Sequence, residues 1–321
     1  MKCIVIYFSQ TGNTEKVARA IQAGIEQVGG HCDLSEIRQV DPLRLQDYDL
    51  IGIGSPVMGA DPANVGDFVN RLRFVGGKHA FVFYTHGTSP GFFWPSIYPK
   101  LSAHGLVVIG QAHWYGDCHL LHMPQPYPTA GHPDEMDLEE AERFGREMAI
   151  RSAHIRAGET DLIPPAPPAI PPRPPRVDDG RSMLDLINAF GSMLQFDREK
   201  CLYPDCRLCM DNCPTYGNDL SVDPPILGEP CLGCEFCARL CPTGALDMSA
   251  WVQEMIEATK KHLPMMLPGL EKAEAEGLFR RLIPIEKIDV DNPGIRQYTK
   301  HPQWIIGKGP QKPPEAHKND R

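Results

Sequence analysis

The first half of the chain alternates short apolar runs with longer segments of helical periodicity. The apolar runs occupy residues 3–8, 31–37, 49–55, 79–85 and 106–111, and the helical segments occupy residues 15–28, 63–73, 92–104 and 137–157. Short apolar strands between helices favour a parallel sheet covered on both faces, because each parallel pair needs a crossover helix. We therefore predict an α/β fold with a five-stranded, doubly wound parallel sheet and right-handed crossovers.

A proline-rich segment interrupts this pattern. Residues 163–176 read IPPAPPAIPPRPPR, with eight prolines in fourteen residues. Such a segment favours polyproline II and forms a semi-rigid spacer of about 3.1 Å per residue. We predict a domain boundary here, with a first domain at 1–160, a linker at 161–180, a second domain at 181–250 and a C-terminal helix and extended tail at 251–321.

The second half has weaker periodicity. Residues 182–196 predict an amphipathic helix, because Leu184, Ile187, Phe190 and Leu194 fall on one stripe. A further helix is predicted at 250–262, ending before Pro264, since proline interrupts a helix interior. Residues 282–306 are expected to be extended and irregular, and the polar composition from residue 307 onward is typical of a frayed tail.

Charge and hydropathy narrow the class of protein. The 321 residues carry a formal charge of −9, which argues against a nucleic-acid partner. No apolar run approaches the ~20 residues of a membrane span. The start, MKCIVIYF, is too short for a signal peptide. We therefore expect a cytoplasmic protein without a membrane span.

The first predicted strand leads into a polar loop at residues 9–14, SQTGNT, which a helix follows. Backbone N–H groups and hydroxyls surround a small concavity in such a loop, and the helix N-terminus adds its positive dipole end. The loop therefore predicts a phosphate site. It is not a Walker loop, because no Gly-Lys-Ser/Thr follows. The alternative is a Ser/Thr-rich helix cap without a ligand.

The stretch YFSQTGNTEKVARAI resembles the start of flavodoxins, in which this loop holds the FMN phosphate. LIGIGSPVMGADPANVGDFV resembles their loop after strand three, YTHGTSPG at 84–91 resembles the loop after strand four, and GHPDEMDLEEAERFGREM at 131–148 resembles the last helix. The resemblance covers residues 1–157 and implies the strand order 2-1-3-4-5, with FMN at the carboxyl ends of strands one, three and four. The FMN-binding residues that it implies are Ser9, Gln10, Thr11, Gly12, Asn13, Thr14, Ser55, Pro56, Val57, Met58, Thr85, His86, Gly87 and Gly91.

Met58 departs from this pattern, because it stands where flavodoxins commonly have an aromatic residue against the flavin. The candidates for the missing aromatic face are Phe92, Phe93, Trp94, Trp114 and Tyr115, and for any one of them we expect ordinary packing more than contact with the flavin. The stretch HWYGDCHLLHMP at 113–124 contains metal-ligand types, namely His113, Cys118, His119 and His122. Their spacing matches no compact zinc pattern, so we expect a loop after strand five near the flavin edge.

Eight of the 11 cysteines lie between Cys201 and Cys241, a density that predicts metal binding in a cytosolic chain. The second half of this segment fits C-x2-C-x2-C-x3-C-P, and the first half repeats the pattern with four residues in its first gap. Cys3, Cys32 and Cys118 stand apart and are interpreted as core or loop residues.

Residues 199–248 resemble a bacterial-type ferredoxin, a small α+β domain with two [4Fe–4S] clusters, in which the cysteine before each proline ligates the other cluster. The resemblance implies one cluster on Cys201, Cys206, Cys209 and Cys241, and a second on Cys213, Cys231, Cys234 and Cys237. Two alternatives stay open. One is structural zinc, and the other is a labile or three-iron cluster that lacks Cys201 as a ligand because of the wide gap.

The whole chain resembles a class of flavodoxin–ferredoxin fusions of anaerobes. The resemblance implies FMN and two [4Fe–4S] clusters that exchange electrons with a redox protein partner or a larger oxidoreductase complex; a homo-oligomer is compatible with this role. The chain has no dinucleotide fingerprint and no supported nucleophile pattern, so we expect an oxidoreductase component without its own organic substrate. The alternatives are a self-contained flavin-dependent reductase of a quinone or similar acceptor, and a subunit whose clusters serve structure or assembly.

Overall fold

The computed structural model describes residues 1–59, 61–169 and 193–291. These residues form two units. The first unit contains residues 1–118, 126–169 and 265–288 of the described chain, and the second contains residues 119–125, 193–264 and 289–291. The predicted helix at 182–196 lies mostly outside the described residues, as do the end of the proline-rich segment and the predicted tail from residue 307.

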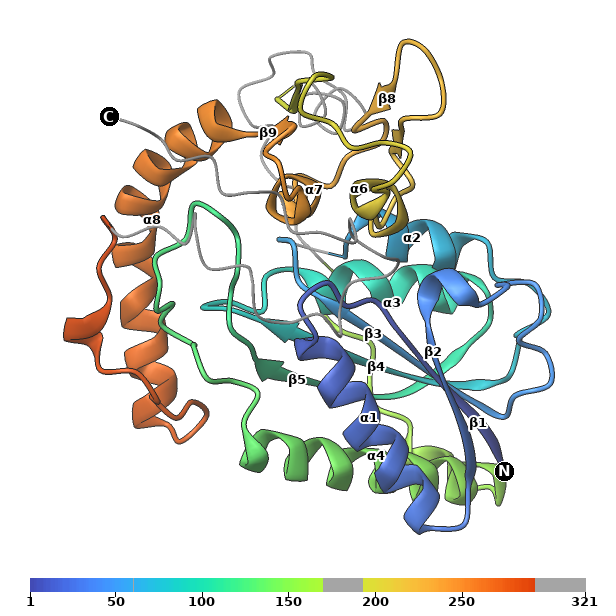
Figure 1. Cartoon of the computed structure of the whole chain (residues 1–321). Coiled ribbons are helices and arrows are strands. Elements are labelled where there is room, and N and C mark those ends of the chain that lie inside the picture. Colours follow the sequence, from blue (N-terminus) through green and yellow to red (C-terminus); the bar gives the residue numbers. More distant parts are fainter. Residues whose placement is uncertain (60, 170–192, 292–321) are drawn as a thin grey trace. The chain divides into compact units, whose positions relative to one another are not determined.

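The first unit is built on a parallel sheet (Figure 1). Its strands are β1 (Lys2–Tyr7), β2 (His31–Glu36), β3 (Leu50–Pro56), β4 (His79–His86) and β5 (Val107–Tyr115). They pair in parallel in the order β2-β1-β3-β4-β5, which confirms the predicted fold class and strand order of this part of the chain. Strands β1, β3 and β4 therefore end at one edge of the sheet, where the loops of the predicted flavin site begin.

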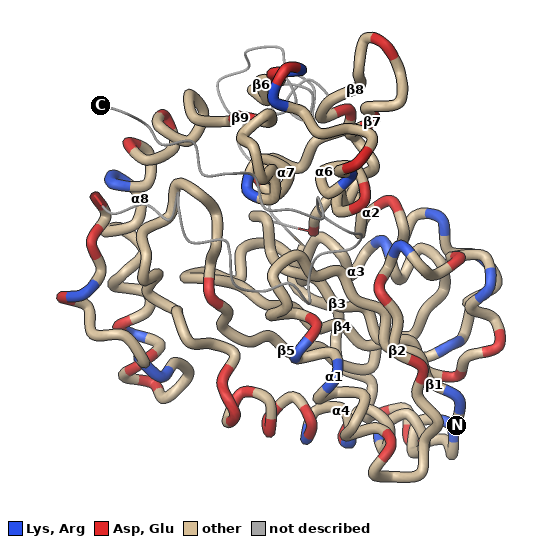
Figure 2. The backbone as a smooth tube through the Cα atoms, in the orientation of Figure 1, with Lys and Arg blue, Asp and Glu red and all other residues tan. Residues whose placement is uncertain are grey.

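Two pairs of helices cover the sheet. Figure 1 shows α1 (Asn13–Gln27) and α4 (Glu135–Arg156) on one face, and α2 (Ala63–Asn70) and α3 (Phe93–Ala103) on the other. Glycines allow α1 and α4 to approach closely, because a Cβ on Gly145 would lie 2.1 Å from the Ile21 carbonyl oxygen. The strands β3, β4 and β5 carry no charged residue, as Figure 2 shows, which fits their burial between helices.

Before residue 249, the second unit has little regular structure. Two short antiparallel pairs join β6 (Gln195–Phe196) to β9 (Leu246–Asp247) and β7 (Asn218–Asp219) to β8 (Ile226–Leu227). Its short helices are α6 (Leu208–Asp211) and α7 (Phe236–Leu240). The short spacing between cysteines leaves no room for longer elements, so the unit is organised around its cysteine-containing turns.

The helix α8 (Ser249–Ala275) corrects the prediction that a helix ends before Pro264. Each proline removes one helical hydrogen bond, but the apolar stripe continues past both Pro264 and Pro268. Val252, Ile256, Leu263 and Leu270 along this stripe are at most 5% exposed, and their burial offsets the lost hydrogen bonds. In the described part of the chain, no helix has both the length and the apolar character that a membrane span needs.

The two units are interleaved along the sequence. Residues 119–125, which follow β5, belong to the second unit, and residues 265–288 belong to the first. Buried or paired side chains hold each of these two segments in its unit, and the sequence pattern did not reveal them. The remaining elements are the 3-10 turns η1 (Ile37–Gln39), η2 (Thr160–Leu162) and η3 (Ile285–Lys287), the last of which lies in the segment predicted to be irregular.

Candidate cofactor sites

The loop between β1 and α1 has the geometry of an anion site. Gly12 adopts the left-handed conformation with φ 88°, and its N–H donates to Ser9 Oγ at 3.2 Å. No side chain caps the N-terminus of α1, so its first N–H groups stay available to a ligand. The Nε2 atom of Gln10 is buried and has no hydrogen-bond partner among the described residues. The loop therefore fits a bound phosphate.

Hydrogen bonds tie this loop to two other strand ends. The hydroxyls of Thr14 and Thr85, both buried, lie 2.8 Å apart and link α1 to the end of β4. The side-chain amide of Asn13 donates to the carbonyl oxygen of Asp117 at 2.9 Å, beyond the end of β5. The structure thus brings together predicted site residues from the first helix and the fourth strand.

The loops after β3 and β4 lie against each other. The N–H of Val57 donates to Thr85 O at 2.9 Å, and the N–H of Phe92 donates to Gly59 O at 2.8 Å. Gly91 has φ +55°, and a Cβ on it would lie 2.5 Å from Gly59 O, so the close approach needs glycine. Residues 55–58 and 85–91 therefore form two sides of one edge of the sheet.

Two of the five candidate aromatic side chains have the expected ordinary role and belong to the core. Phe93 is fully buried with its ring centroid 4.8 Å from that of Tyr84, and Trp114 is 5% exposed and packs edge-on against Phe144. Tyr115 packs against Phe279 at 4.6 Å. Phe92, which is 43% exposed, and Trp94, which is partly exposed, lie at the start of α3 and stay candidates.

Two histidines form a pair at the ends of β4 and β5. His86 Nε2 lies 3.0 Å from His113 Nδ1, and His86 Nδ1 lies 2.8 Å from Gly87 O. Because a carbonyl oxygen only accepts, His86 Nδ1 carries the hydrogen and Nε2 accepts from His113. Burial lowers the pKa of His86 to about 3, so the ring stays neutral.

The potential metal ligands at 113–124 are divided between the two units. His113 contacts His86, and His122 contacts Glu235. Within the described ranges, one group of His and carboxylate side chains lies close enough to hold a metal, namely His132, Asp134 and Asp137. Arg280 donates to both carboxylates of this group, so a cation already occupies the position.

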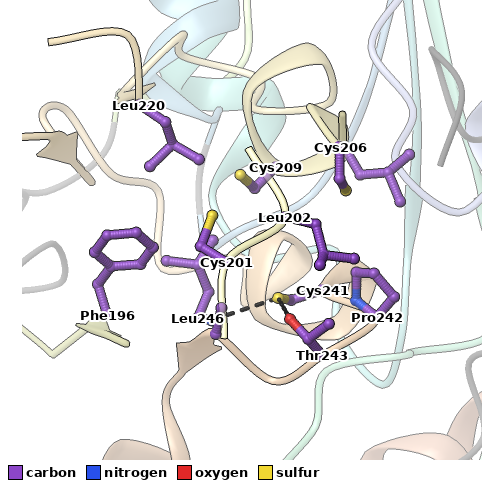
Figure 3. A pocket seen from close by; sticks show the side chains of 12 residues that line it. Phe196, Cys201, Leu202, Cys206, Cys209, Leu220, Cys241, Pro242, Thr243 and Leu246 are labelled. Carbon is purple, nitrogen blue, oxygen red and sulfur yellow. Dashed lines mark hydrogen bonds between the residues drawn. The ribbon is translucent and has the colours of Figure 1, made fainter. Parts of the chain in front are cut away.

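Four cysteines surround a pocket in the second unit that is open in part to solvent (Figure 3). The N–H of Cys206 donates to Leu202 O at 3.0 Å, so the wide first gap folds into a closed turn that keeps both of its cysteines at the pocket. The remaining lining is mainly apolar and includes Phe196, Leu208, Leu220 and Leu246. The four cysteines are Cys201, Cys206, Cys209 and Cys241.

The other four cysteines line a second pocket. They are Cys213, Cys231, Cys234 and Cys237. Each pocket thus combines three cysteines of one run with the Cys-Pro cysteine of the other run. None of the eight thiols forms a disulfide, and burial raises the pKa of Cys209 to about 12. Four sulfur donors around a mainly apolar pocket suit an iron–sulfur cluster or zinc, whose binding replaces the thiol proton.

Glu235, between Cys234 and Cys237, was missed by sequence reasoning. Its backbone is left-handed with φ 57°, and its side chain is 0% exposed. The N–H of Leu121 lies 2.5 Å from Glu235 Oε2, and His122 Nδ1 lies 2.7 Å from Oε1. This buried contact places residues 119–125 in the second unit. The charge of a residue between two cysteines was its sole signal in the sequence.

Comparison with known proteins concerns the N-terminal half of the chain. An uncharacterised protein of Methanocaldococcus jannaschii is 28% identical over 157 residues, 46% of this chain and 98% of that protein. A flavodoxin of Clostridium beijerinckii is 24% identical over 149 residues, 45% and 97% of the two chains. An NAD(P)H dehydrogenase (quinone) of Archaeoglobus fulgidus is 26% identical over 193 residues, 46% and 95%.

Among solved structures, a flavodoxin from the domain Archaea aligns with a TM-score of 0.39 and 25% identity, over 48% of this chain and 100% of that one. Residues 4–94 match the family model described as a flavodoxin domain. The N-terminal part of the chain is therefore a flavodoxin-like domain.

Proposed function

We propose that the chain is an electron-transfer protein with FMN in its flavodoxin-like domain and two [4Fe–4S] clusters in its second unit. It passes electrons between these centres and to or from a partner redox protein or a larger oxidoreductase complex. The observation that carries the proposal is the crossed grouping of the eight cysteines around two pockets. FMN exchanges two electrons and the clusters exchange one at a time, so the combination joins two-electron and one-electron carriers.

The loop at residues 9–14 would hold the FMN phosphate through its N–H groups and hydroxyls. The uncapped helix α1 and the unpaired amide of Gln10 support this assignment. Residues 55–58 and 85–91 would flank the ring system, with Phe92 or Trp94 as the aromatic side chain against it. The neutral His86–His113 pair adds no charge to this edge of the sheet.

The second unit would hold one cluster on Cys201, Cys206, Cys209 and Cys241, and the other on Cys213, Cys231, Cys234 and Cys237. Backbone N–H groups already point at several of these sulfurs, including Gly217 N at 3.2 Å from Cys213 Sγ and Gly233 N at 3.3 Å from Cys231 Sγ. Such hydrogen bonds stabilise thiolate charge. The apolar lining of both pockets limits access of water to the metal.

A flavin-dependent reductase is the second candidate. It is favoured by the 26% identity to a protein named NAD(P)H dehydrogenase (quinone), which the chain matches over 46% of its own length. Steady-state turnover separates the two proposals. An electron-transfer component alone shows no NAD(P)H-dependent quinone reduction, whereas a self-contained reductase turns over without a partner.

The decisive experiment is anaerobic purification of the full chain with iron, acid-labile sulfide, zinc and FMN measured on one sample. We expect the iron and sulfide of two [4Fe–4S] clusters and one FMN per chain. Cys201→Ser and Cys231→Ser should each disturb the EPR signal of a different cluster, and Cys118→Ser should leave both unchanged. Zinc in place of iron, or an unchanged cluster content in both ligand variants, would overturn the proposal. Co-purification from the native host then identifies the partner.

A further inference from the structure

The second unit contains the tripeptide Cys-Pro-Thr twice, at residues 213–215 and 241–243. In each copy the threonine hydroxyl lies near the cysteine sulfur two residues earlier. The distances are 3.4 Å for Thr215 and 3.7 Å for Thr243. Identical tripeptides thus hold corresponding cysteines of the two pockets, but the two threonine hydroxyls differ in their hydrogen bonds.

The hydroxyl of Thr215 is already committed to another acceptor. Its Oγ1 lies 2.6 Å from the carbonyl oxygen of Pro230, which can only accept a hydrogen bond. A threonine hydroxyl has one hydrogen, and a metal-bound cysteine sulfur has none to offer in return. Thr215 therefore does not donate to Cys213, whose sulfur accepts from Gly217 N at 3.2 Å.

The bond from Thr215 to Pro230 joins two stretches that carry ligands of the same pocket. Pro230 directly precedes Cys231, and both cysteines line the second pocket. The backbones approach closely here, because a Cβ on Gly217 would lie 2.2 Å from Pro230 O, and Glu229 N donates to Gly217 O at 3.0 Å. Thr215 thus fixes the position of one ligand segment against the other.

Thr243 has no such second acceptor. Among the residues that the structure describes, the hydroxyl of Thr243 has one hydrogen-bond partner, the sulfur of Cys241 (Figure 3). Leu246 N also donates to this sulfur, at 3.5 Å. Once Cys241 is bound as a thiolate, Thr243 is the donor by necessity, so this sulfur receives from its threonine the O–H hydrogen bond that Thr215 gives to Pro230 instead.

We propose that Thr243 sets the reduction potential of the cluster that Cys241 ligates, whereas Thr215 is a positioning residue for the ligands of the other cluster. The inference rests on the proposed function. A hydrogen bond to a ligand sulfur favours the reduced cluster, because reduction adds negative charge that the sulfur shares. Loss of the Thr243 hydroxyl therefore shifts that cluster to a more negative potential.

The test compares Thr243→Val with Thr215→Val in the full chain with its cofactors. Valine keeps the shape of threonine and removes the hydroxyl, and Thr→Ser at each position is the control that retains it. EPR-monitored potentiometry should show a negative shift of one midpoint potential in Thr243→Val, with unchanged iron content, and recovery in Thr243→Ser. Thr215→Val should leave both potentials in place and accelerate iron release to a chelator.

The cluster that shifts is identified with Cys201→Ser, which removes the signal of the cluster on the same pocket as Cys241. Equal shifts in the two valine variants, or a shift in Thr215→Val alone, would overturn the inference. So would a Thr243→Val protein whose potentials match those of the wild type. A wild-type chain without iron–sulfur signals would instead overturn the proposed function, so the two failures are distinct.

Discussion

The two units bury their chains by different means. Among the described residues, the largest fully buried side chains, from Ile6 to Ile97, all belong to the first unit. The core of the second unit is small and includes the thiol of Cys209, which is 9% exposed. A domain of this size with little apolar volume needs additional stabilisation. If the second unit binds the clusters of the proposed function, the first unit is held by packing and the second by its metal.

Removal of iron should produce the largest difference between the units. Chelation under anaerobic conditions is expected to unfold the second unit, because four thiols that the metal held together are released around each pocket. Hydrogen exchange followed by mass spectrometry should show loss of protection in residues 193–264. The strands β1 to β5 should keep their protection, because their core contains no metal ligand.

The control is removal of FMN, which should loosen residues 9–14 and 85–91 and leave residues 193–264 protected. Retention of full protection in the second unit after complete iron removal would refute the comparison. It would mean that the small apolar core, with Leu220, Leu246 and Val252, suffices for folding.

Addition of one methyl group between α1 and α4 should have the next largest effect, on the free energy of unfolding of the first unit. Gly145→Ala places a Cβ 2.1 Å from Ile21 O and 2.9 Å from Ile21 Cα, both backbone atoms that cannot move aside without separating α1 from α4. We expect a loss of about 3 kcal/mol in the free energy of unfolding of the first unit, at the upper end for over-packing. Urea unfolding of the cofactor-loaded chain measures it.

Gly269→Ala is the matched control, because no atom lies within 4 Å of its Cβ position and the residue lies within α8. Alanine has a higher helix propensity, so this variant should be more stable than the wild type, by up to about 1 kcal/mol. Equal effects of the two substitutions would contradict the assignment of first-unit stability to close packing.

The same contrast explains what the sequence could and could not predict. The strands of the first unit follow from short apolar runs between helical segments, and the order of the sheet follows from the resemblance of three loops and the last helix. The end of α8 could not be predicted, because the local rule for proline was outweighed by burial of Leu263 and Leu270 in the folded chain. Propensity is local, whereas burial depends on residues far away in sequence.

The site shows the same limit. The resemblance of residues 199–248 to a bacterial-type ferredoxin implied two sets of four cysteines, and these are the sets that line the two pockets of the second unit. Spacing carried no information on Glu235, whose partners Leu121 and His122 lie more than a hundred residues earlier. Nor did it separate Phe93 and Trp114, which pack in the core, from Phe92 and Trp94, because all four have the same apolar character.

Neutralising Glu235 should test whether the second unit also depends on this buried contact. In Glu235→Gln the amide oxygen can still accept the hydrogen bond from Leu121 N. The amide nitrogen, however, cannot accept a hydrogen bond from His122 Nδ1. The expected loss is ~2 kcal/mol for an unsatisfied buried group. Hydrogen exchange should rise in residues 119–125 and 231–241. Glu229→Gln, at an exposed position of the same unit, is the control and should change neither segment.

The smallest effect concerns how residues 265–288 are held in the first unit. Arg280 donates to Asp134 through two bonds of 2.6 Å and holds the pKa of that carboxyl well below its usual range. A lowered carboxyl pKa stabilises the folded state above the unfolded value of about 3.9, and the stabilisation is lost as the pH falls. The weakening of the attachment of residues 265–288 at low pH therefore depends on Arg280.

His132 acts in the opposite sense. Burial pulls its pKa down, but its hydrogen bonds to Asp137 and to the carbonyl of Arg280 outweigh burial and raise it. Both partners accept, so both ring nitrogens must carry hydrogen. This stabilisation is complete below the unfolded pKa of about 6.5 and disappears as the pH rises through the higher folded value.

Protection of residues 279–288, corrected for intrinsic exchange rates, should therefore be greatest between about pH 4 and pH 6.5 and fall on both sides. Arg280→Met removes the side-chain bonds but keeps the carbonyl that His132 binds. It should lower protection by about tenfold near neutral pH, for a loss of ~1.4 kcal/mol. It should also reduce the fall in protection at low pH (the acid limb) and leave the fall at high pH (the alkaline limb) unchanged.

The control is Arg143→Met, whose partner Glu140 is 3.8 Å away. It should change neither limb. An acid limb that survives in Arg280→Met would show that packing of Phe279 and Leu282, rather than this ion pair, attaches the segment and sets its pH dependence.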